Sequence, residues 1–299
     1  MNKNAAFAAG LCLICIVGIG LGSWYLEAKP KQEEPVFSVT EQEERAAEIQ
    51  TPPLQPLEEE ISRMIEGKSG QWSVYIKNLW TNEELEYNPV QMKPASVIKL
   101  FRMVALHQAA QQSELELTEE LSELAEKMIT VSENAASNEI VMALGQGNFE
   151  VGAQKVTQIA QELGCTGTQD GVMLFDYDPW FLVSGQNLTT MRDCGLILER
   201  IYRKECVSPM YDQEMLYLLL GQTRKEKIPA LLPEGSWVAN KTGETDDIQA
   251  DVGIVFSPGC DYVICVIVNE TWDGLESQRT IAEISQSVYS YFNDNVSGG

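Results

Sequence analysis

The clearest candidates for chemistry in this sequence are a serine and a lysine that lie three residues apart. Residues 94–100 read PASVIKL, and in a helix Ser96 and Lys99 would occupy adjacent turns of one face, with the hydroxyl beside the amine. A lysine accepts a proton from a serine only when burial or neighbouring cations lower its pKa, and the apolar neighbours of this pair favour such burial. Because a Ser-x-x-Lys tetrad is common by chance, a helix N-cap serine with a surface lysine is the alternative interpretation.

Two further short motifs follow along the chain. Residues 132–134 (Ser-Glu-Asn) precede a helical pattern, and residues 241–243 (Lys-Thr-Gly) end a strand-like segment before a polar turn. Taken separately, the first motif could be an ordinary helix N-cap and the second only a strand end. Together with Ser96 and Lys99, they form an ordered set of hydroxyl, amide and ammonium groups, which suits nucleophilic catalysis without histidine.

The three motifs in this order resemble the signature of class A β-lactamases and penicillin-binding proteins, which is Ser-x-x-Lys, Ser-Asp-Asn and Lys-Thr-Gly. Residues 221–244 also look like that family's approach to its last active-site strand, and the likeness extends over about residues 60–295. The resemblance implies a β-lactamase or DD-peptidase-like fold and a penicillin-recognising serine hydrolase.

The resemblance also implies a role for each motif position. Ser96 would be the acylated nucleophile and Lys99 would take its proton, directly or through water. Ser132 would relay a proton to the leaving amine, and Asn134 would hold Lys99 and the substrate amide. Lys241 would supply positive charge for a substrate carboxylate.

Further contacts to the substrate follow from the same resemblance. Thr242 would offer a hydroxyl, Gly243 would let the substrate backbone approach the strand, and Glu133 would line the binding site. The oxyanion hole would consist of the backbone N–H groups of Ser96 and Glu244, which would stabilise the developing charge.

The sequence departs from the family at two places. The middle residue of the second motif is Glu133 instead of Asp, so its hydrogen bonds must reach one methylene further. Class A β-lactamases also carry a Glu-x-x-Leu-Asn motif whose glutamate activates the deacylating water, and residues 164–187 contain no such motif. Asp170, Asp176 or Asp178 could substitute for that glutamate, each with a shorter side chain. Because the three motifs for acylation are present and the glutamate motif is missing, we expect acylation with slow deacylation.

The elements that must position these residues can be read from the hydrophobic pattern. Strand patterns cover residues 72–79, 84–87, 237–241, 252–256 and 262–268, whereas helical patterns cover residues 96–112, 115–128, 135–144, 148–163, 188–203, 210–220 and 276–292. Asn187 is the candidate N-cap of the helix at 188–203. Because strands from both ends flank a helical centre, we predict an α+β fold, a three-layer α/β/α sandwich. Its antiparallel sheet is built from N- and C-terminal segments, with an inserted all-helical subdomain.

Composition excludes several functional classes. Of 299 residues, 21 are basic and 44 acidic, and the net charge of −23 disfavours binding to nucleic acid. The single histidine, His107, and seven scattered cysteines, two of them inside the apolar N-terminal segment, leave too few ligands for zinc, so we expect neither a metal nor a cofactor. His107 lies away from the motif face of its predicted helix and is interpreted as a packing or surface residue.

The N-terminal region predicts a membrane attachment. Residues 5–26 carry no charge and are long enough to cross a bilayer as a helix, so we expect residues 1–26 to form a retained anchor, a cleaved signal peptide being the alternative. Residues 27–56 are rich in Glu and Pro and predict a solvated linker, followed by a hydrolase domain at 57–299. This domain would lie outside the cytoplasm, at the cell membrane, or be secreted if the segment is cleaved.

Seven cysteines leave the disulfide pattern open. Cys12 and Cys15 lie inside the apolar N-terminal segment. The other five permit one or two bridges with at least one unpaired thiol, and they are Cys165, Cys194, Cys206, Cys260 and Cys265.

We expect, from all these observations, a monomeric serine hydrolase that acts slowly on β-lactams or on a peptidoglycan-like or other amide or ester substrate. A D-Ala-D-Ala carboxypeptidase-like wall enzyme is the second hypothesis. A non-catalytic ligand-sensing or wall-binding module is the third.

Overall fold

The computed structural model describes residues 53–175 and 186–294, which all belong to the compact unit Glu43–Gly299. The expected anchor at residues 1–26, nearly all of the expected linker, Cys12 and Cys15 lie outside the described residues. Within the two described ranges, no helix combines the length and apolar character that a membrane span requires.

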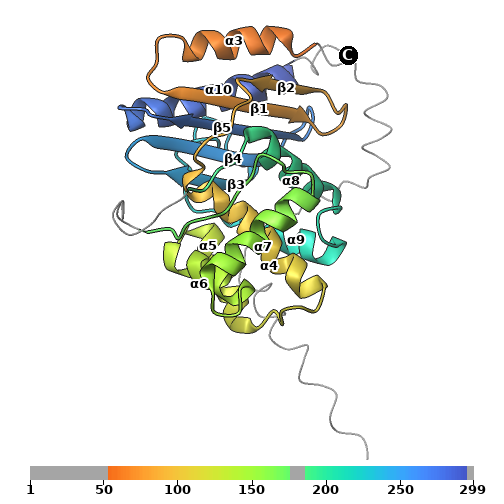
Figure 1. The fold of residues 1–299 in the computed structure, drawn as a ribbon. Helices are drawn as coiled ribbons and strands as arrows, with labels where there is room; N and C mark the ends of the chain where they lie inside the picture. The colour runs from red at the N-terminus through yellow and green to blue at the C-terminus, as the bar shows by residue number, and fades with distance from the viewer. Residues whose placement is uncertain (1–52, 176–185, 295–299) are drawn as a thin grey trace, which may run out of the picture. The chain divides into compact units, whose positions relative to one another are not determined.

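A single antiparallel sheet forms the centre of the fold. In the described residues it contains the strands β1 (Gln71–Asn78), β2 (Glu84–Tyr87), β3 (Trp237–Glu244), β4 (Ile248–Phe256) and β5 (Tyr262–Asn269). The order is β2-β1-β5-β4-β3, and every neighbouring pair is antiparallel. Strand β1 pairs with β5 along its whole length, so segments distant in sequence share one sheet, as predicted (Figure 1).

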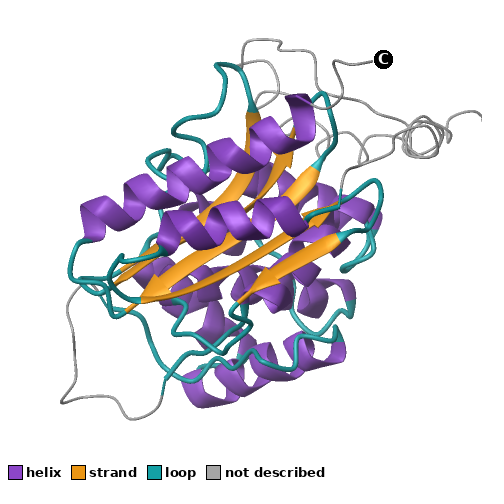
Figure 2. Ribbon diagram, turned by 90° about the horizontal axis from the view of Figure 1, so that it is seen from above, coloured by secondary structure: helices purple, strands orange, loops and turns teal. Residues whose placement is uncertain are grey.

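Helices cover both faces of the sheet. One face carries α3 (Gln55–Ile65) and α10 (Gly274–Asp294) (Figures 1 and 2). On the other side lie the short 3-10 helix η1 (Ala95–Ile98) and the helices α4 (Lys99–Gln111), α5 (Glu119–Thr130), α6 (Asn134–Leu144), α7 (Phe149–Glu162), α8 (Met191–Arg203) and α9 (Pro209–Leu220). The predicted α+β, three-layer arrangement with an inserted helical subdomain is confirmed.

Two hydrophobic cores hold the layers together, and β5 contributes to both. All eight residues of β5 are buried, because helices cover both faces of this central strand. Alternate side chains of β5 point in opposite directions. Ile264, Val266 and Val268 join the core beneath α3 and α10, whereas Val263, Cys265 and Ile267 join the core on the helical side.

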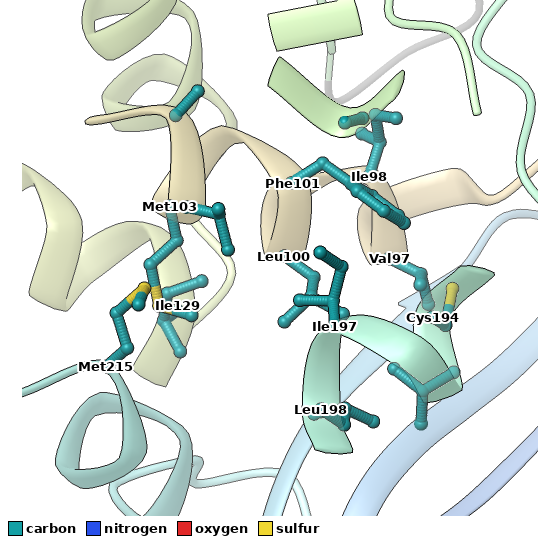
Figure 3. Close-up of a cluster of buried hydrophobic side chains, with 14 of the residues drawn as sticks. Val97, Ile98, Leu100, Phe101, Met103, Ile129, Cys194, Ile197, Leu198 and Met215 are labelled. Carbon is teal, nitrogen blue, oxygen red and sulfur yellow. The ribbon is translucent and has the colours of Figure 1, made fainter. Parts of the chain in front are cut away.

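The helix that follows the candidate nucleophile is buried on nearly all sides. In Figure 3, α4 residues such as Leu100 and Met103 pack among Ile129 of α5, Ile197 of α8 and Met215 of α9. Buried residues occupy ten of its thirteen positions, including three polar ones, Lys99, Arg102 and His107. Close packing from several directions therefore fixes the position of the N-terminus of α4.

Several details differ from the sequence-based expectations. Helix α3 was not among the predicted elements, and it begins at Gln55, inside the stretch 27–56 expected as linker, because Leu57, Ile61 and Ile65 form a buried stripe. The N-cap of α8 is Thr190, whose hydroxyl accepts from the Asp193 N–H at 3.0 Å, so the prediction of Asn187 as N-cap is wrong.

The single histidine and the five cysteines of the described residues are buried in the core. His107 is buried, with Nδ1 2.8 Å from the Met103 carbonyl oxygen and its ring edge against Tyr211, which agrees with a packing role. Each of the five cysteines in the described residues is a buried, unpaired thiol, so no disulfide links them.

Candidate active site

Three separate parts of the chain bring the motif residues together. Ser96 lies in η1, and Lys99 begins α4. Ser132 lies in the turn before α6, which begins at Asn134. Lys241 lies on β3, the edge strand that packs against η1. The hydroxyl, amide and amine groups therefore meet where the sheet adjoins the helical layer.

The Lys99 amine is the centre of the hydrogen bonding. The residue is fully buried, and its Nζ lies 3.0 Å from Ser96 Oγ and 2.7 Å from Asn134 Oδ1. The same amine donates to the Ser132 carbonyl oxygen at 2.6 Å and lies 3.2 Å from Ser132 Oγ. The alternative of a surface lysine beside an N-cap serine is therefore wrong.

Ser132 also contacts the second amine of the site. Lys241 Nζ donates to Ser132 Oγ at 2.9 Å and to the Thr242 carbonyl oxygen at 2.8 Å, and the whole residue is buried. Burial lowers the pKa of Lys241 to about 7, with Asp251 opposing this change and Arg224 reinforcing it. Ser132 Oγ thus lies between two lysine amines, and no side chain caps the start of α6.

The third motif brings its strand against the backbone of the nucleophile. A Cβ atom at Gly243 would lie 2.7 Å from the Pro94 carbonyl oxygen and 3.2 Å from the Val97 N, so only glycine permits this approach. Thr242 is buried beside Gly243, and the backbone of Glu244 follows directly. The roles of these residues as substrate contacts and as part of an oxyanion hole remain predictions. Glu133, which was expected to line the site, is exposed.

Backbone strain marks two positions in the site. Ala95, which precedes the nucleophile, has φ of 46°, and Ser132 has φ of 63°. Left-handed conformations of residues other than glycine cost on the order of 1–3 kcal/mol each and are kept only where surrounding structure enforces them. Both occur next to the groups that would react, which is the distribution expected of a preorganised site.

Asp170, the first of the three candidates for a deacylating carboxylate, forms an ion pair with Arg102. Arg102 Nε lies 2.7 Å from Asp170 Oδ2, and Arg102 Nη2 lies 2.7 Å from Asp170 Oδ1. Both side chains are fully buried. Asp170 therefore belongs to a buried ion pair that is held by two hydrogen bonds. Asp176 and Asp178 lie outside the described residues.

Sequence reasoning missed a group of charged residues beneath the end of β3. Asp251 is fully buried on β4 and accepts from Asn240 Nδ2 at 2.9 Å and from the Ile228 N–H at 3.0 Å. Burial raises the pKa of Asp251, and Lys227 is the main influence in the opposite direction. A lone aspartate inside the apolar strand IQADVGIVF was the available signal, because such a charge needs buried partners.

The comparisons with known proteins identify the family. The model of the beta-lactamase enzyme family Beta-lactamase2 matches residues 56–122 and 120–292. The chain therefore belongs to this family, and the predicted family resemblance is confirmed.

Individual relatives agree with this assignment. The chain is 33% identical over 123 residues to the extended-spectrum beta-lactamase PER-1 of Pseudomonas aeruginosa, a match that spans only 38% of that enzyme and 36% of this chain. The crystal structure of the extended-spectrum beta-lactamase TLA-1 has the same fold, with a TM-score of 0.72 and 20% identity over 80% of this chain and 99% of that one. A mutant of PBP-A, solved as an acyl-enzyme complex with penicillin G, has a TM-score of 0.70 and 25% identity over 81% of this chain and 98% of that one.

Proposed function

We propose that this beta-lactamase-family chain is a serine hydrolase that β-lactams, or related amides and esters, acylate at Ser96, and whose acyl-enzyme is hydrolysed slowly. The observation that carries the proposal is the contact between Ser96 Oγ and the buried Lys99 amine, at 3.0 Å. A nucleophile within hydrogen-bond reach of a base is the arrangement that serine acylation requires.

The partners of Lys99 suit an amine that acts as a base. The Ser132 carbonyl oxygen and Asn134 Oδ1 can only accept hydrogen bonds, so together they use two N–H groups. A neutral amine has two N–H groups and one lone pair. In that form Lys99 would take the hydroxyl proton of Ser96, whose Oγ lies 3.0 Å from Nζ.

The same contacts give a balanced path for the acylation step. Ser96 Oγ forms a bond to the carbonyl carbon of the substrate, and its proton passes to Lys99. When the carbon–nitrogen bond breaks, the leaving nitrogen takes a proton from Ser132 Oγ. Ser132 is reprotonated by Lys99, 3.2 Å away, which returns the base to its neutral form. Lys241, at 2.9 Å from Ser132 Oγ, stabilises the hydroxyl as it loses its proton.

Slow deacylation follows from the use of Asp170 in the ion pair with Arg102. Hydrolysis of the ester needs a base for water, and this carboxylate is occupied by a guanidinium. The solved acyl-enzyme complex of the PBP-A mutant with penicillin G supports the view that a fold of this kind can hold a penicillin adduct.

Intact-mass spectrometry of the full chain after exposure to a penicillin, a cephalosporin and a carbapenem tests the proposal. We expect a mass increase equal to one β-lactam, which persists for many minutes. Ser96→Ala should abolish the adduct, whereas Ser132→Ala should slow its formation, because only the proton relay is lost. An adduct that survives Ser96→Ala, or no adduct with any of the three compounds, would refute the proposed mechanism.

A carboxypeptidase-like activity would give a different result in the same series. Release of D-alanine from a D-alanyl-D-alanine peptide, without hydrolysis of a chromogenic cephalosporin, would assign the chain to wall metabolism. The membrane anchor at residues 1–26, the location outside the cytoplasm and the monomeric state remain predictions from the sequence.

A further inference from the structure

The carboxylate of Glu244, which directly follows the Lys-Thr-Gly motif, pairs with the side chains of Arg224 and Lys227. Arg224 Nη1 donates to Glu244 Oε1, and Lys227 Nζ lies 3.2 Å from Glu244 Oε2. The Lys227 side chain is only 2% exposed, whereas the side chains of Glu244 and Arg224 are each 39% exposed. The cluster therefore opens to solvent on the side of Glu244.

This cluster lies beside the candidate nucleophile. The backbone at Gly243 approaches Pro94 and Val97, the residues that flank the turn holding Ser96. Lys227 Nζ also lies 3.4 Å from the Gly243 carbonyl oxygen, so the buried cation is bound to the strand that would receive the substrate. A substrate acylating Ser96 would thus extend along β3 toward this cluster.

The other cation of the motif is engaged elsewhere. Lys241 is fully buried and directs its amine to Ser132 Oγ and the Thr242 carbonyl oxygen. The positive partner available to a substrate carboxylate would therefore be Arg224 or Lys227. Both already have one in Glu244.

We propose, on the basis of the proposed acylation at Ser96, that Glu244 is a specificity-determining residue: an internal carboxylate that occupies Arg224 and Lys227 and so disfavours anionic substrates. An incoming carboxylate must displace Glu244 or lie beside a like charge, and both cost free energy. Substrates that are neutral or cationic at that end meet no such competition. The chain accordingly discriminates by charge at this end of β3.

The charge state of Glu244 agrees with this role. Partial burial alone would raise its pKa, but Lys227 and Arg224 together hold the pKa of Glu244 below its usual value. The carboxylate is therefore ionised at neutral pH and competes as an anion. Its ion pair with Arg224 is half-exposed and contributes little to stability, whereas the buried Lys227 keeps Asp251 as a second opposite charge.

The test compares one penicillin as its free carboxylate and as its neutral methyl ester, with the full chain. The second-order rate constant of acylation is measured by intact mass for the wild type, for Glu244→Gln and for Glu270→Gln. Gln keeps an oxygen that can accept from Lys227, so the buried cation is not left without a partner. Glu270 is exposed at the end of β5, and its substitution removes the same charge at a site outside the cluster.

We expect Glu244→Gln to raise the ratio of acid to ester rate constants at least tenfold, and Glu270→Gln to leave it within twofold. If an adduct forms but Glu244→Gln leaves the ratio within twofold, or lowers it, the inference is overturned while acylation at Ser96 stands. A rise of equal size in Glu270→Gln would also overturn it, because the effect would then reflect overall charge.

Equilibrium binding in a Ser96→Ala background separates this inference from acylation itself. We expect Glu244→Gln to tighten binding of the free acid relative to the ester by at least tenfold there as well. Should no variant form an adduct, acylation at Ser96 fails, and unchanged relative binding of acid and ester in this background would overturn the role of Glu244 independently.

Discussion

Asp170→Asn should destabilise the fold strongly without acting through catalysis. The Asp170 carboxylate receives two hydrogen bonds of 2.7 Å from Arg102, and neither side chain is exposed. In the variant, Arg102 keeps Ser137 Oγ at 3.0 Å and the Val172 carbonyl oxygen at 2.9 Å as partners, but it loses its counter-charge. A buried guanidinium without a carboxylate is the costly product of this substitution.

The expected magnitude follows from those contacts. Breaking a buried ion pair by removing one partner costs about 3–5 kcal/mol, and the asparagine oxygen can still accept one bond, so we expect a loss of about 3 kcal/mol. Ser137→Ala is the graded control, because it removes one hydrogen bond to the same guanidinium and should cost about 1.5–3 kcal/mol.

Urea unfolding of the purified full chain measures these differences. With an m-value of about 2 kcal/mol/M, a loss of 3 kcal/mol lowers the midpoint by about 1.5 M. Deacylation is followed in parallel by the decay of the β-lactam adduct. A stability loss below about 1 kcal/mol together with much slower deacylation would show that Asp170 acts as a catalytic carboxylate, and the structural role of the ion pair would be refuted.

Two further predictions concern buried groups. Because burial lowers the pKa of Lys241 from 10.5 to about 7, the unfolded chain binds more protons between these values, and stability from this group rises with pH across that window. The unfolding free energy of the wild type minus that of Lys241→Met should therefore increase from pH 7 to pH 10, and a decrease would contradict the buried amine. Gly195→Ala on α8 should lower stability by about 1–3 kcal/mol, because its Cβ would lie 2.2 Å from the ring of Tyr75, which is fixed by a hydrogen bond to Glu84. Thermal unfolding measures this, and the gain of about 1 kcal/mol typical of alanine in a helix would show that the ring moves freely.

Much of the fold was predictable because its signals are local. The strand β5 (YVICVIVN) has an apolar run that can only be a central strand or a buried helix, and its eight-residue length favours the strand. The helices α6 and α7 lie within one residue of their predicted bounds, since their apolar spacing and preceding polar residues coincide. One antiparallel sheet shared by N- and C-terminal strands was predictable because both sets of strands had to bury a common face.

Other features were not predictable because they depend on tertiary contacts. Helix α3 has only a sparse apolar stripe among glutamates, which resembles a solvated linker until α10 supplies a surface for Leu57 and Ile61. Asn187 looks like an N-cap by position, but its Oδ1 accepts from the Gly171 and Val172 N–H groups instead and fixes the loop.

The candidate site was likewise predictable only in its locally encoded part. The three motifs identified the amines and hydroxyls that meet, since residue type and spacing within each motif carry the signal. The pairing of Asp170 with Arg102 joins residues 68 apart, and the contact of Glu244 with Arg224 joins residues 20 apart. No local pattern specifies such pairs, so the sequence did not predict that Asp170 would form a buried ion pair with Arg102.

The buried charges of the site have a cost in stability that their partners must offset. Lys99, Lys241 and Asp251 are each fully buried, and Lys227 is 2% exposed, so several charged or ionisable groups are withdrawn from water at one end of the sheet. Each such withdrawal costs free energy unless hydrogen bonds and opposite charges compensate, and the left-handed backbone at Ser132 adds strain. The carboxylates of Glu244 and Asp251 compensate the charge of Lys227. The Lys241 amine donates hydrogen bonds to neutral oxygens, and burial lowers its pKa. In the proposed mechanism Lys241 stabilises the Ser132 hydroxyl as it loses its proton, so the buried position that costs stability also places this amine against the proton relay.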